Sequence, residues 1–175
     1  MSVILRKTKL IIYLRDMNKN GKFVRQVTHP VLFRLFSLKD IPMLLLAGIR
    51  VKEVDETHAL TTLKLGYLNK NPFRSIYFAC QAMAAEASTG VLAMMYVYGA
   101  SPRVSMLVTG MKATFSKKAV GRVQFTCMDG KAIANAIAET QRTGDGVTIN
   151  ATSVGKDEQG DVIAEFVFEW SFKKK

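Results

Sequence analysis

The sequence has little of the residues that build disulfide frameworks and metal sites. It contains two cysteines, Cys80 and Cys127, and two histidines, His29 and His58. Two cysteines cannot form a disulfide framework, and they are typical of a reducing compartment, so we expect a cytoplasmic protein. Because no CxxC pair or Cys/His cluster occurs, we expect no metal site. His58 lies in a predicted strand beside an acidic turn, where we expect an exposed or hydrogen-bonded surface residue.

Acidic residues are also scarce. The chain has 14 Asp and Glu against 25 Lys and Arg, which gives a net charge of +11 and an isoelectric point of about 9.8. Such an excess points to anionic partners: nucleic acid, anionic lipid or phosphorylated metabolites. The sequence shows no recognition-helix pattern and no interleaving of aromatic and basic residues, so we expect no nucleic-acid partner.

The chain lacks an uninterrupted apolar run of membrane-spanning length. The run from Ile41 to Ile49 is far below the roughly 20 residues that a membrane helix needs. The stretch from Ala79 to Tyr98 is long enough, but it contains Gln81, Glu86, Ser88 and Thr89, which favours a buried core helix. Lys and Arg interrupt the apolar N-terminus, which makes it a poor signal peptide. We therefore expect no stable membrane insertion.

The 175 residues show the pattern of a single α+β domain. Period-two alternation predicts half-buried antiparallel strands, and a long Ala- and Met-rich segment predicts one central helix. The predicted strands are Ile49–Val54, Thr57–Leu65, Ser105–Phe115, Gly121–Met128, Val147–Val154 and Val162–Phe172. In the last strand, the predicted apolar face is Val162, Ala164, Phe166, Phe168, Trp170 and Phe172, and it alternates with Ile163, Glu165, Val167 and Glu169. The predicted helices are Pro30–Leu38, Ser75–Tyr98 and Lys131–Gln141. The long helix must bury its apolar face against the sheet.

The first 45 residues predict a helical extension, and residues 46–175 predict the main domain. Apolar residues recur at roughly helical spacing between Val31 and Leu38. A helix packed on the domain is the favoured interpretation. A helix lying on a membrane surface is the alternative, because Arg and Lys are scattered among the apolar residues.

Glu86 is the one charged residue over most of the long helix. Its neighbours at helical spacing are small, so a sheet could approach closely. A carboxylate there would be costly to desolvate without a partner, and its pKa would rise, which suits a general base. A carboxylate on an exposed edge, or one that caps a neighbouring backbone, explains the residue equally well.

The segment from Asn69 to Gly90 resembles the core motif of the hotdog-fold acyl-CoA thioesterases, the phenylacetyl-CoA thioesterase-like superfamily. Asn71 and Glu86 stand at that family's spacing, and the strand order over Gly48 to Phe172 agrees with it. The resemblance is greatest to a branch without an established function. Where the family has His-Gly-Gly at the start of the helix, this sequence has Tyr77-Phe78-Ala79, and the bulky ring narrows the approach of a substrate.

The resemblance implies a hotdog fold and hydrolysis of an acyl-CoA thioester. Glu86 would be the base or nucleophile, Asn71 the positioning group, the Phe78 amide the oxyanion donor, and the Tyr77 hydroxyl would replace the family's His. The site would lie between two subunits of a homodimer, or of a tetramer built from two dimers. Coenzyme A would enter as part of the substrate, with no separate cofactor.

The basic residues on or beside the strands after the helix are candidates to bind the phosphates of coenzyme A: Lys112, Lys117, Lys118 and Arg122. Solvated surface charge is the simpler explanation of the same residues. Two other functions stay open. One is a non-catalytic hotdog protein that binds acyl-CoA or another apolar ligand. The other is a basic peripheral protein whose positive face docks on an anionic membrane or nucleic acid.

Overall fold

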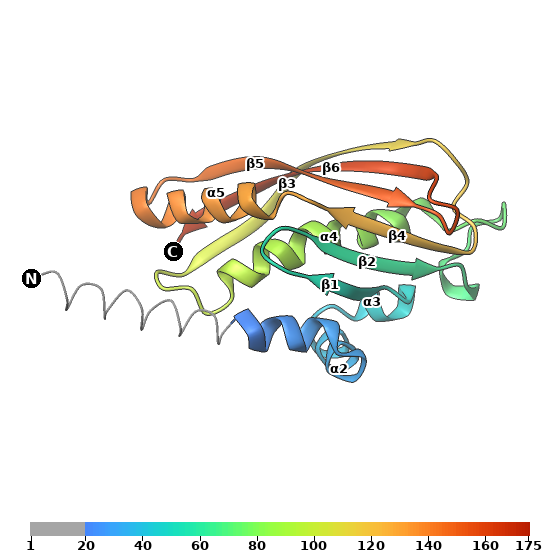
Figure 1. The fold of residues 1–175 in the computed structure, drawn as a ribbon, viewed down its shortest axis with the longest axis horizontal. Coiled ribbons are helices and arrows are strands. Elements are labelled where there is room, and N and C mark those ends of the chain that lie inside the picture. The colour runs from blue at the N-terminus through green and yellow to red at the C-terminus, as the bar shows by residue number, and fades with distance from the viewer. Residues whose placement is uncertain (1–19) are drawn as a thin grey trace, which may run out of the picture.

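The computed structural model describes residues 20–175, which form one antiparallel sheet, a long helix beneath it and a layer of short helices outside it (Figure 1). The helices are residues 20–28, α2 (Pro30–Asp40), α3 (Pro42–Ala47), α4 (Phe78–Val97) and α5 (Gly130–Thr143), with a short 3-10 turn, η1, at Tyr67–Asn69. The strands are β1 (Arg50–Val54), β2 (Ala59–Lys64), β3 (Val104–Phe115), β4 (Arg122–Cys127), β5 (Val147–Lys156) and β6 (Val162–Lys174).

The sheet has the order β1-β2-β4-β5-β6-β3, and every neighbouring pair is antiparallel. It curves around α4, which lies against its concave face (Figure 1). This arrangement confirms the predicted α+β class and hotdog fold. Among the strands of residues 20–175, β3 pairs only with β6 and is therefore an edge strand over its 12 residues. A long unpaired edge is a ready template for another strand.

Small residues and a few polar bonds hold α4 against the sheet. Ala84 and Ala85 are fully buried, and the Ser88 hydroxyl lies 2.8 Å from that of Ser153 on β5. The Trp170 indole N–H donates to the Thr89 hydroxyl at 2.9 Å. Small side chains let the helix approach closely, and these bonds satisfy polar atoms that would otherwise be costly to bury.

The predicted alternation of β6 holds from Ala164 to Phe172 and is wrong at the start of the strand. Val162 is exposed and Ile163 is fully buried, the reverse of the expectation. The register with β5 shifts between Gly155 and Lys156, which pair with Ala164 and Val162. The bulge leaves Ile163 without an opposite residue and turns its side chain into the core.

The N-terminal helices form a separate layer outside β1 (Figure 1). α2 and α3 each begin with a proline at the first helical position, where a missing N–H costs nothing. Their inner side contributes Phe33 and Leu44 to the core. The predicted helical extension is thus present within the described residues, and α3 continues it to Ala47.

Candidate functional site

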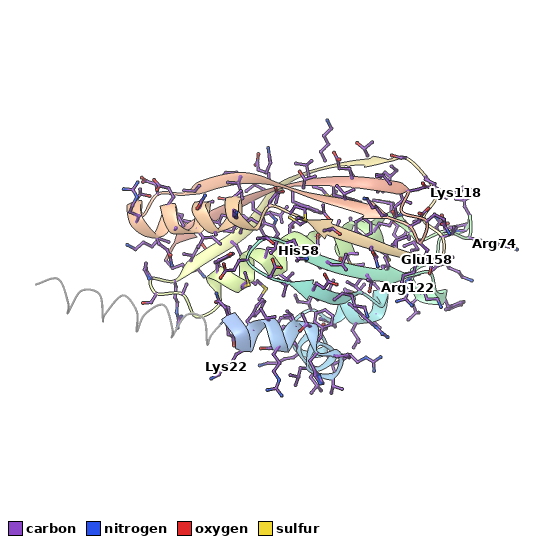
Figure 2. The ribbon with its side chains drawn as sticks, viewed as in Figure 1. Lys22, His58, Arg74, Lys118, Arg122 and Glu158 are labelled. Atoms are coloured by element: carbon purple, nitrogen blue, oxygen red, sulfur yellow. The ribbon has the colours of Figure 1, made fainter. Side chains whose placement is uncertain are left out.

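A groove of about 760 Å³ lies where α4 begins, between the preceding loop and the end of β3. Its lining comes from two parts of the chain: residues 70–73 and 75–78 with Gln81, and residues 115–119. The groove brings together five of the predicted site residues: Asn71, Tyr77, Phe78, Lys117 and Lys118. Lys118 and Arg74 extend from this end of the molecule (Figure 2).

Aromatic rings form the apolar wall of the groove. The Phe78 ring meets Tyr77 edge-on at 4.9 Å between centroids and Phe115 edge-on at 6.4 Å. Phe115 in turn packs against the buried Phe166 at 5.5 Å. Phe73 and Phe78 expose 76% and 52% of their surface. These exposed rings give an apolar ligand a surface to bind.

The first turn of α4 has unpaired backbone donors, and its first residue, Phe78, lines this groove. Tyr77 is the N-cap residue, and its side chain does not cap the helix. The first amide that returns to the Tyr77 carbonyl is that of Cys80, at 2.9 Å. Within residues 20–175, the amides of Phe78 and Ala79 have no hydrogen-bond acceptor. Such orphan N–H groups at the positive end of a helix can bind a developing negative charge.

The Asn71 side chain is used to shape the loop before the helix. Its Oδ1 accepts hydrogen bonds from the Phe73 amide at 2.9 Å and the Ser75 amide at 3.2 Å, while its Nδ2 donates to Ser75 Oγ at 3.0 Å. Arg74 stands between them with φ +59°, a left-handed conformation. This loop makes α4 begin at Phe78, three residues later than predicted. To position a water molecule, the Asn71 side chain would have to give up its hydrogen bond to Ser75 and bind the water in its place.

Gln81 is a groove residue to which the sequence interpretation gave no role. It is 5% exposed, and its Nε2 donates to the Ile76 carbonyl at 3.0 Å. That bond fixes the amide orientation and leaves Oε1 without a hydrogen-bond partner in the described part of the chain. The sequence does offer one sign of such a role, because Gln81 is a single amide one turn into an otherwise apolar helix. A polar side chain that is buried in such a helix needs hydrogen-bond partners, from the protein or from a ligand.

The Glu86 carboxylate forms no hydrogen bond or ion pair with any residue from 20 to 175, and its side chain is half-buried. Burial raises its pKa above the ordinary value. Its Oε1 lies over Gly90, where a Cβ would stand 3.3 Å from that oxygen. Glycine at this position therefore leaves room for the carboxylate. The structure supports the predicted desolvated carboxylate and shows no capping role for it.

Glu86 does not line the groove of its own chain. It follows Phe78 by eight residues, a separation of about 12 Å along the helix axis. A single chain therefore brings Asn71 and Phe78 to one groove and leaves Glu86 outside it.

Lys117 is a groove residue whose charge is already paired. Its Nζ contacts Asp157 at 2.6 Å and Asp161 at 2.7 Å, and the hydrogen bond that Lys117 donates to Asp157 raises the Lys117 pKa. The pair joins the end of β3 to the β5–β6 turn. A phosphate would therefore have to compete with two carboxylates for this lysine.

The other predicted cations lie in three different environments. Lys118 lines the groove, with Nζ 6.0 Å from the centroid of the Phe73 ring. Arg122 lines a separate depression of about 440 Å³ together with Glu158, and both are labelled at the same end of the molecule in Figure 2. Lys112 is exposed on the edge strand β3. Lys118 is thus the best placed of these three to meet a ligand in the groove.

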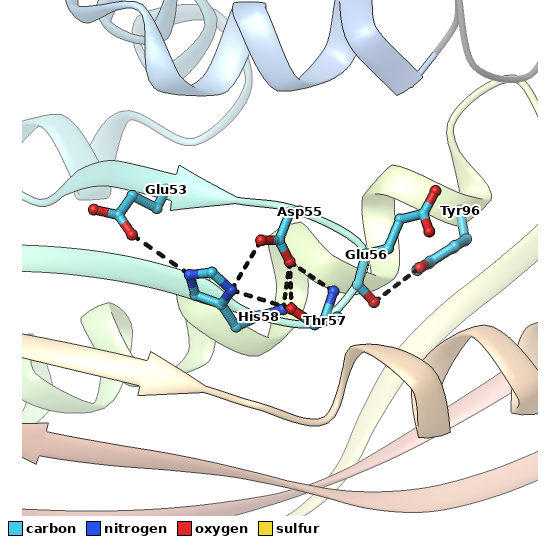
Figure 3. Close-up of polar contacts among 6 residues, drawn as sticks. All are labelled: Glu53, Asp55, Glu56, Thr57, His58 and Tyr96. Atoms are coloured by element: carbon cyan, nitrogen blue, oxygen red, sulfur yellow. Dashed lines mark hydrogen bonds and ion pairs between the residues drawn. The ribbon is translucent and has the colours of Figure 1, made fainter.

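His58 belongs to a surface cluster in the β1–β2 hairpin (Figure 3). Its Nε2 lies 3.4 Å from Glu53 Oε2, and its Nδ1 lies 3.0 Å from Asp55 Oδ2. Hydrogen bonds from Thr57 are the main reason that the Asp55 pKa falls to about 2. These contacts confirm the predicted hydrogen-bonded surface role of His58.

Within the described residues, no group of His, Cys, Asp and Glu is placed to hold a metal ion, and no helix is long and apolar enough to cross a membrane. Both cysteines are buried and unpaired. Burial raises the pKa of the Cys127 thiol to about 12, which leaves it protonated and unreactive at neutral pH.

The curved sheet, the enclosed helix and the groove at the helix start define a hotdog-fold protein. One similar solved structure is a probable thioesterase of unknown function from Pseudomonas aeruginosa, with 21% identity, TM-score 0.71, and coverage of 86% of this chain and 99% of that one. A protein of unknown function from Chlorobaculum tepidum shares 15% identity with TM-score 0.69, over 86% of this chain and 99% of that one. A thioesterase from Haemophilus influenzae shares 11% identity with TM-score 0.58, over 80% of this chain and 88% of that one.

Residues 30–171 match the model of the protein family described as Domain of unknown function (DUF4442). The chain belongs to this family. No curated protein matches the sequence. The structural neighbours share the fold at low identity, and two of the three carry the description thioesterase.

Proposed function

We propose that this protein hydrolyses the thioester of an acyl-coenzyme A, with Glu86 as the base or nucleophile. The observation that carries the proposal is the Glu86 carboxylate, half-buried with a raised pKa and without a partner in residues 20–175. A desolvated carboxylate without a partner destabilises the folded state, and groups with such perturbed pKa values cluster at functional sites. The thioesterase descriptions of the structural neighbours support the same chemistry.

The reaction places each group in a defined role. A water molecule attacks the thioester carbonyl carbon while Glu86 takes its proton, and the carbonyl oxygen gains negative charge. The free amide of Phe78 donates to that oxygen at the positive end of α4. Collapse of the intermediate breaks the C–S bond, and the proton held by Glu86 passes to the coenzyme A thiolate. Asn71 and the Tyr77 hydroxyl, both at the groove, would position the carbonyl or the water.

This chemistry requires a second copy of the chain, because Glu86 lies outside the groove of its own subunit. The edge strand β3 offers the contact surface: it exposes Leu107, Met111 and Phe115, which are 65%, 52% and 47% accessible. Pairing two β3 edges would satisfy their open backbone groups and cover these side chains. A homodimer, or a tetramer of two dimers, would then bring Glu86 of one subunit towards the Phe78 amide of the other.

The acyl group would bind along the aromatic wall, and the nucleotide would extend past Lys118. Lys112, Lys117 and Arg122 are further from such a ligand or already paired, so their contribution would be smaller. Coenzyme A would be part of the substrate, and the two free cysteines agree with a cytoplasmic location.

Two observations favour a second function, the non-catalytic binding of an acyl-CoA or another apolar ligand. The Asn71 amide is occupied by Ser75, and the Phe78 ring stands at the groove where the acyl-CoA thioesterases that the sequence resembles have glycine. A groove that binds without turning its ligand over is consistent with both features.

Hydrolysis of a panel of acyl-CoA substrates by the purified protein distinguishes the two functions, with thiol release followed by a thiol reagent. Catalytic function predicts steady turnover that continues past one equivalent of enzyme. Saturable binding of the same acyl-CoA compounds without thiol release would instead establish the binding function.

A further inference from the structure

The outer surface of the N-terminal helices is apolar although the inner surface already packs on the domain. Phe33 and Ser37 of α2 are buried, and so are Leu44 and Ala47 of α3. A second set of large apolar side chains points outward, with 36% to 63% of each exposed. We call this set the N-terminal apolar face: Val31, Leu32, Leu35, Leu38, Ile41, Met43 and Leu46. Seven large exposed apolar side chains within 16 consecutive residues are the kind of surface that marks an interaction site.

Unpaired cations surround this face. Lys22, Arg25, Arg34 and Lys39 make no ion pair with any of the described residues. Lys22 and Lys39 line a groove of about 450 Å³ between helix 20–28 and α2, with Leu32 and Leu35 in the same groove. Lys22 lies on the outside of the helical layer, away from the sheet (Figure 2). Charge and apolar surface are therefore interleaved on one side of the molecule.

The sequence concentrates its positive charge in this part of the chain. The first 48 residues contain nine Lys and Arg against two Asp and Glu, so they carry +7 of the net charge of +11. The enrichment is independent of the candidate active site, which lies where α4 begins. Lys22 and Lys118 lie towards different ends of the molecule in Figure 2.

We propose that the N-terminal apolar face and its cations dock the protein on the surface of an anionic lipid membrane. An amphipathic helix with Lys and Arg beside exposed leucines lies in the interface, where its apolar side chains enter the acyl boundary and its cations meet anionic head groups. The association that we propose is peripheral, with the helices lying on the membrane surface.

Two other occupants fit the face less well. A second copy of the chain would set one cationic surface against another, and like charges repel. Nucleic acid would satisfy the cations, but it would leave seven large apolar side chains against a polar backbone. An anionic membrane matches both the charge and the apolar surface.

Co-sedimentation of the full chain with vesicles tests the proposal. We expect binding to phosphatidylcholine vesicles that contain about 30% phosphatidylglycerol, and at least tenfold weaker binding to phosphatidylcholine alone. About 0.5 M NaCl should release most of the bound protein, because salt screens exposed charges. Equal binding to both vesicle types, or no binding to either, would overturn the proposal.

Matched variants locate the contact. The double variants Leu35→Ser/Leu38→Ser and Lys22→Glu/Lys39→Glu should each lower vesicle binding at least tenfold, with unchanged melting temperature because the four side chains are exposed. The controls Met128→Ser and Lys131→Glu change exposed residues elsewhere and should bind like the wild type.

Three results would contradict the location or the partner. Variants of the face that bind vesicles like the wild type would place the contact elsewhere. A loss of oligomer on light scattering in Leu35→Ser/Leu38→Ser, without vesicle binding by the wild type, would make the face a contact between copies. Binding of a DNA oligonucleotide without vesicle binding would assign the cations to nucleic acid.

Discussion

Replacing Glu86 by Gln keeps the shape of the side chain and removes its charge and basicity. If Glu86 is the base or nucleophile, kcat for acyl-CoA hydrolysis should fall on the order of 10²-fold or more. The unfolding free energy of the variant should exceed that of the wild type at neutral pH, because the wild type must keep a desolvated carboxylate ionised there. Catalytic loss combined with a gain in stability is the expected signature of a functional carboxylate.

The size of the stability gain depends on pH. Burial holds the folded-state pKa of Glu86 above its ordinary value of 4.5. The raised pKa therefore adds to the unfolding free energy of the wild type in full below pH 4.5, where the carboxyl is protonated. This stabilisation is lost as the pH rises through the folded-state pKa. Each unit of that rise is worth about 1.4 kcal/mol, and 1 kcal/mol corresponds to about 2–4 °C in melting temperature for a chain of this size.

Melting temperature and kcat should be measured on the same Glu86→Gln preparation at several pH values. The excess melting temperature of the variant over the wild type should grow from acidic to neutral pH. Glu165→Gln, which neutralises an exposed glutamate of β6, is the control and should change neither quantity. Unchanged kcat together with a lower melting temperature would refute the catalytic role and show that Glu86 has a stabilising partner.

Four further predictions concern packing, binding, assembly and pH. Gly155→Ala should lower the unfolding free energy by about 1–3 kcal/mol in denaturant titration, because a Cβ would stand 2.9 Å from Cζ of the buried Phe125. Lys118→Glu should raise KM for acyl-CoA more than for an acyl thioester that lacks the nucleotide, because it lies at the groove. Met111→Lys on the edge strand should shift the mass on light scattering towards the 19.4 kDa chain. Asp55→Asn should lower the melting temperature at neutral pH, and the difference should shrink as the pH falls from 3.8 towards about 2, because the lowered pKa stabilises the fold only above that range.

Each of these predictions has a contrary result. Wild-type stability of Gly155→Ala would mean that the Phe125 ring shifts at little cost. Equal effects of Lys118→Glu on both substrates would make that lysine a solvated charge. A wild-type chain that is already a stable monomer at micromolar concentration would remove both the dimer and the shared site. The Asp55 effect should stay below about 1 kcal/mol, because the carboxylate is half-exposed, and a larger one would indicate a further partner.

The sequence predicts the fold well because its strands are strongly periodic and its central helix is long. The alternation from Ala164 to Phe172 identifies the buried face of β6 correctly. It fails at Val162 and Ile163 because a bulge depends on the neighbouring strand, which periodicity within one segment cannot report. The structure starts α4 three residues later than predicted because the Asn71 side chain holds Ser75 in a local loop, and apolar periodicity does not report such side-chain-to-backbone bonds.

The candidate site is only partly readable from the sequence. A lone charge in a small-residue helix identifies Glu86, and its predicted desolvation agrees with the raised pKa. The environment of Lys117 could not be foreseen, because Asp157 and Asp161 reach it from a turn about 40 residues away in sequence. The buried amide of Gln81 acquires meaning only when the groove beside it is known.

The Phe78 amide offers the most direct test of the proposed chemistry, because proline can remove it at that position. Phe78 is the first residue of α4, where proline is tolerated, and Tyr77 before it has φ −59° and ψ 135°, which a following proline permits. Phe78→Ala removes the same ring and keeps the N–H, so it is the matched control. The kcat for acyl-CoA hydrolysis should be about 10²–10³-fold lower in Phe78→Pro than in Phe78→Ala, the usual effect of losing one oxyanion donor. Equal kcat in the two folded variants would contradict the role assigned to the start of α4.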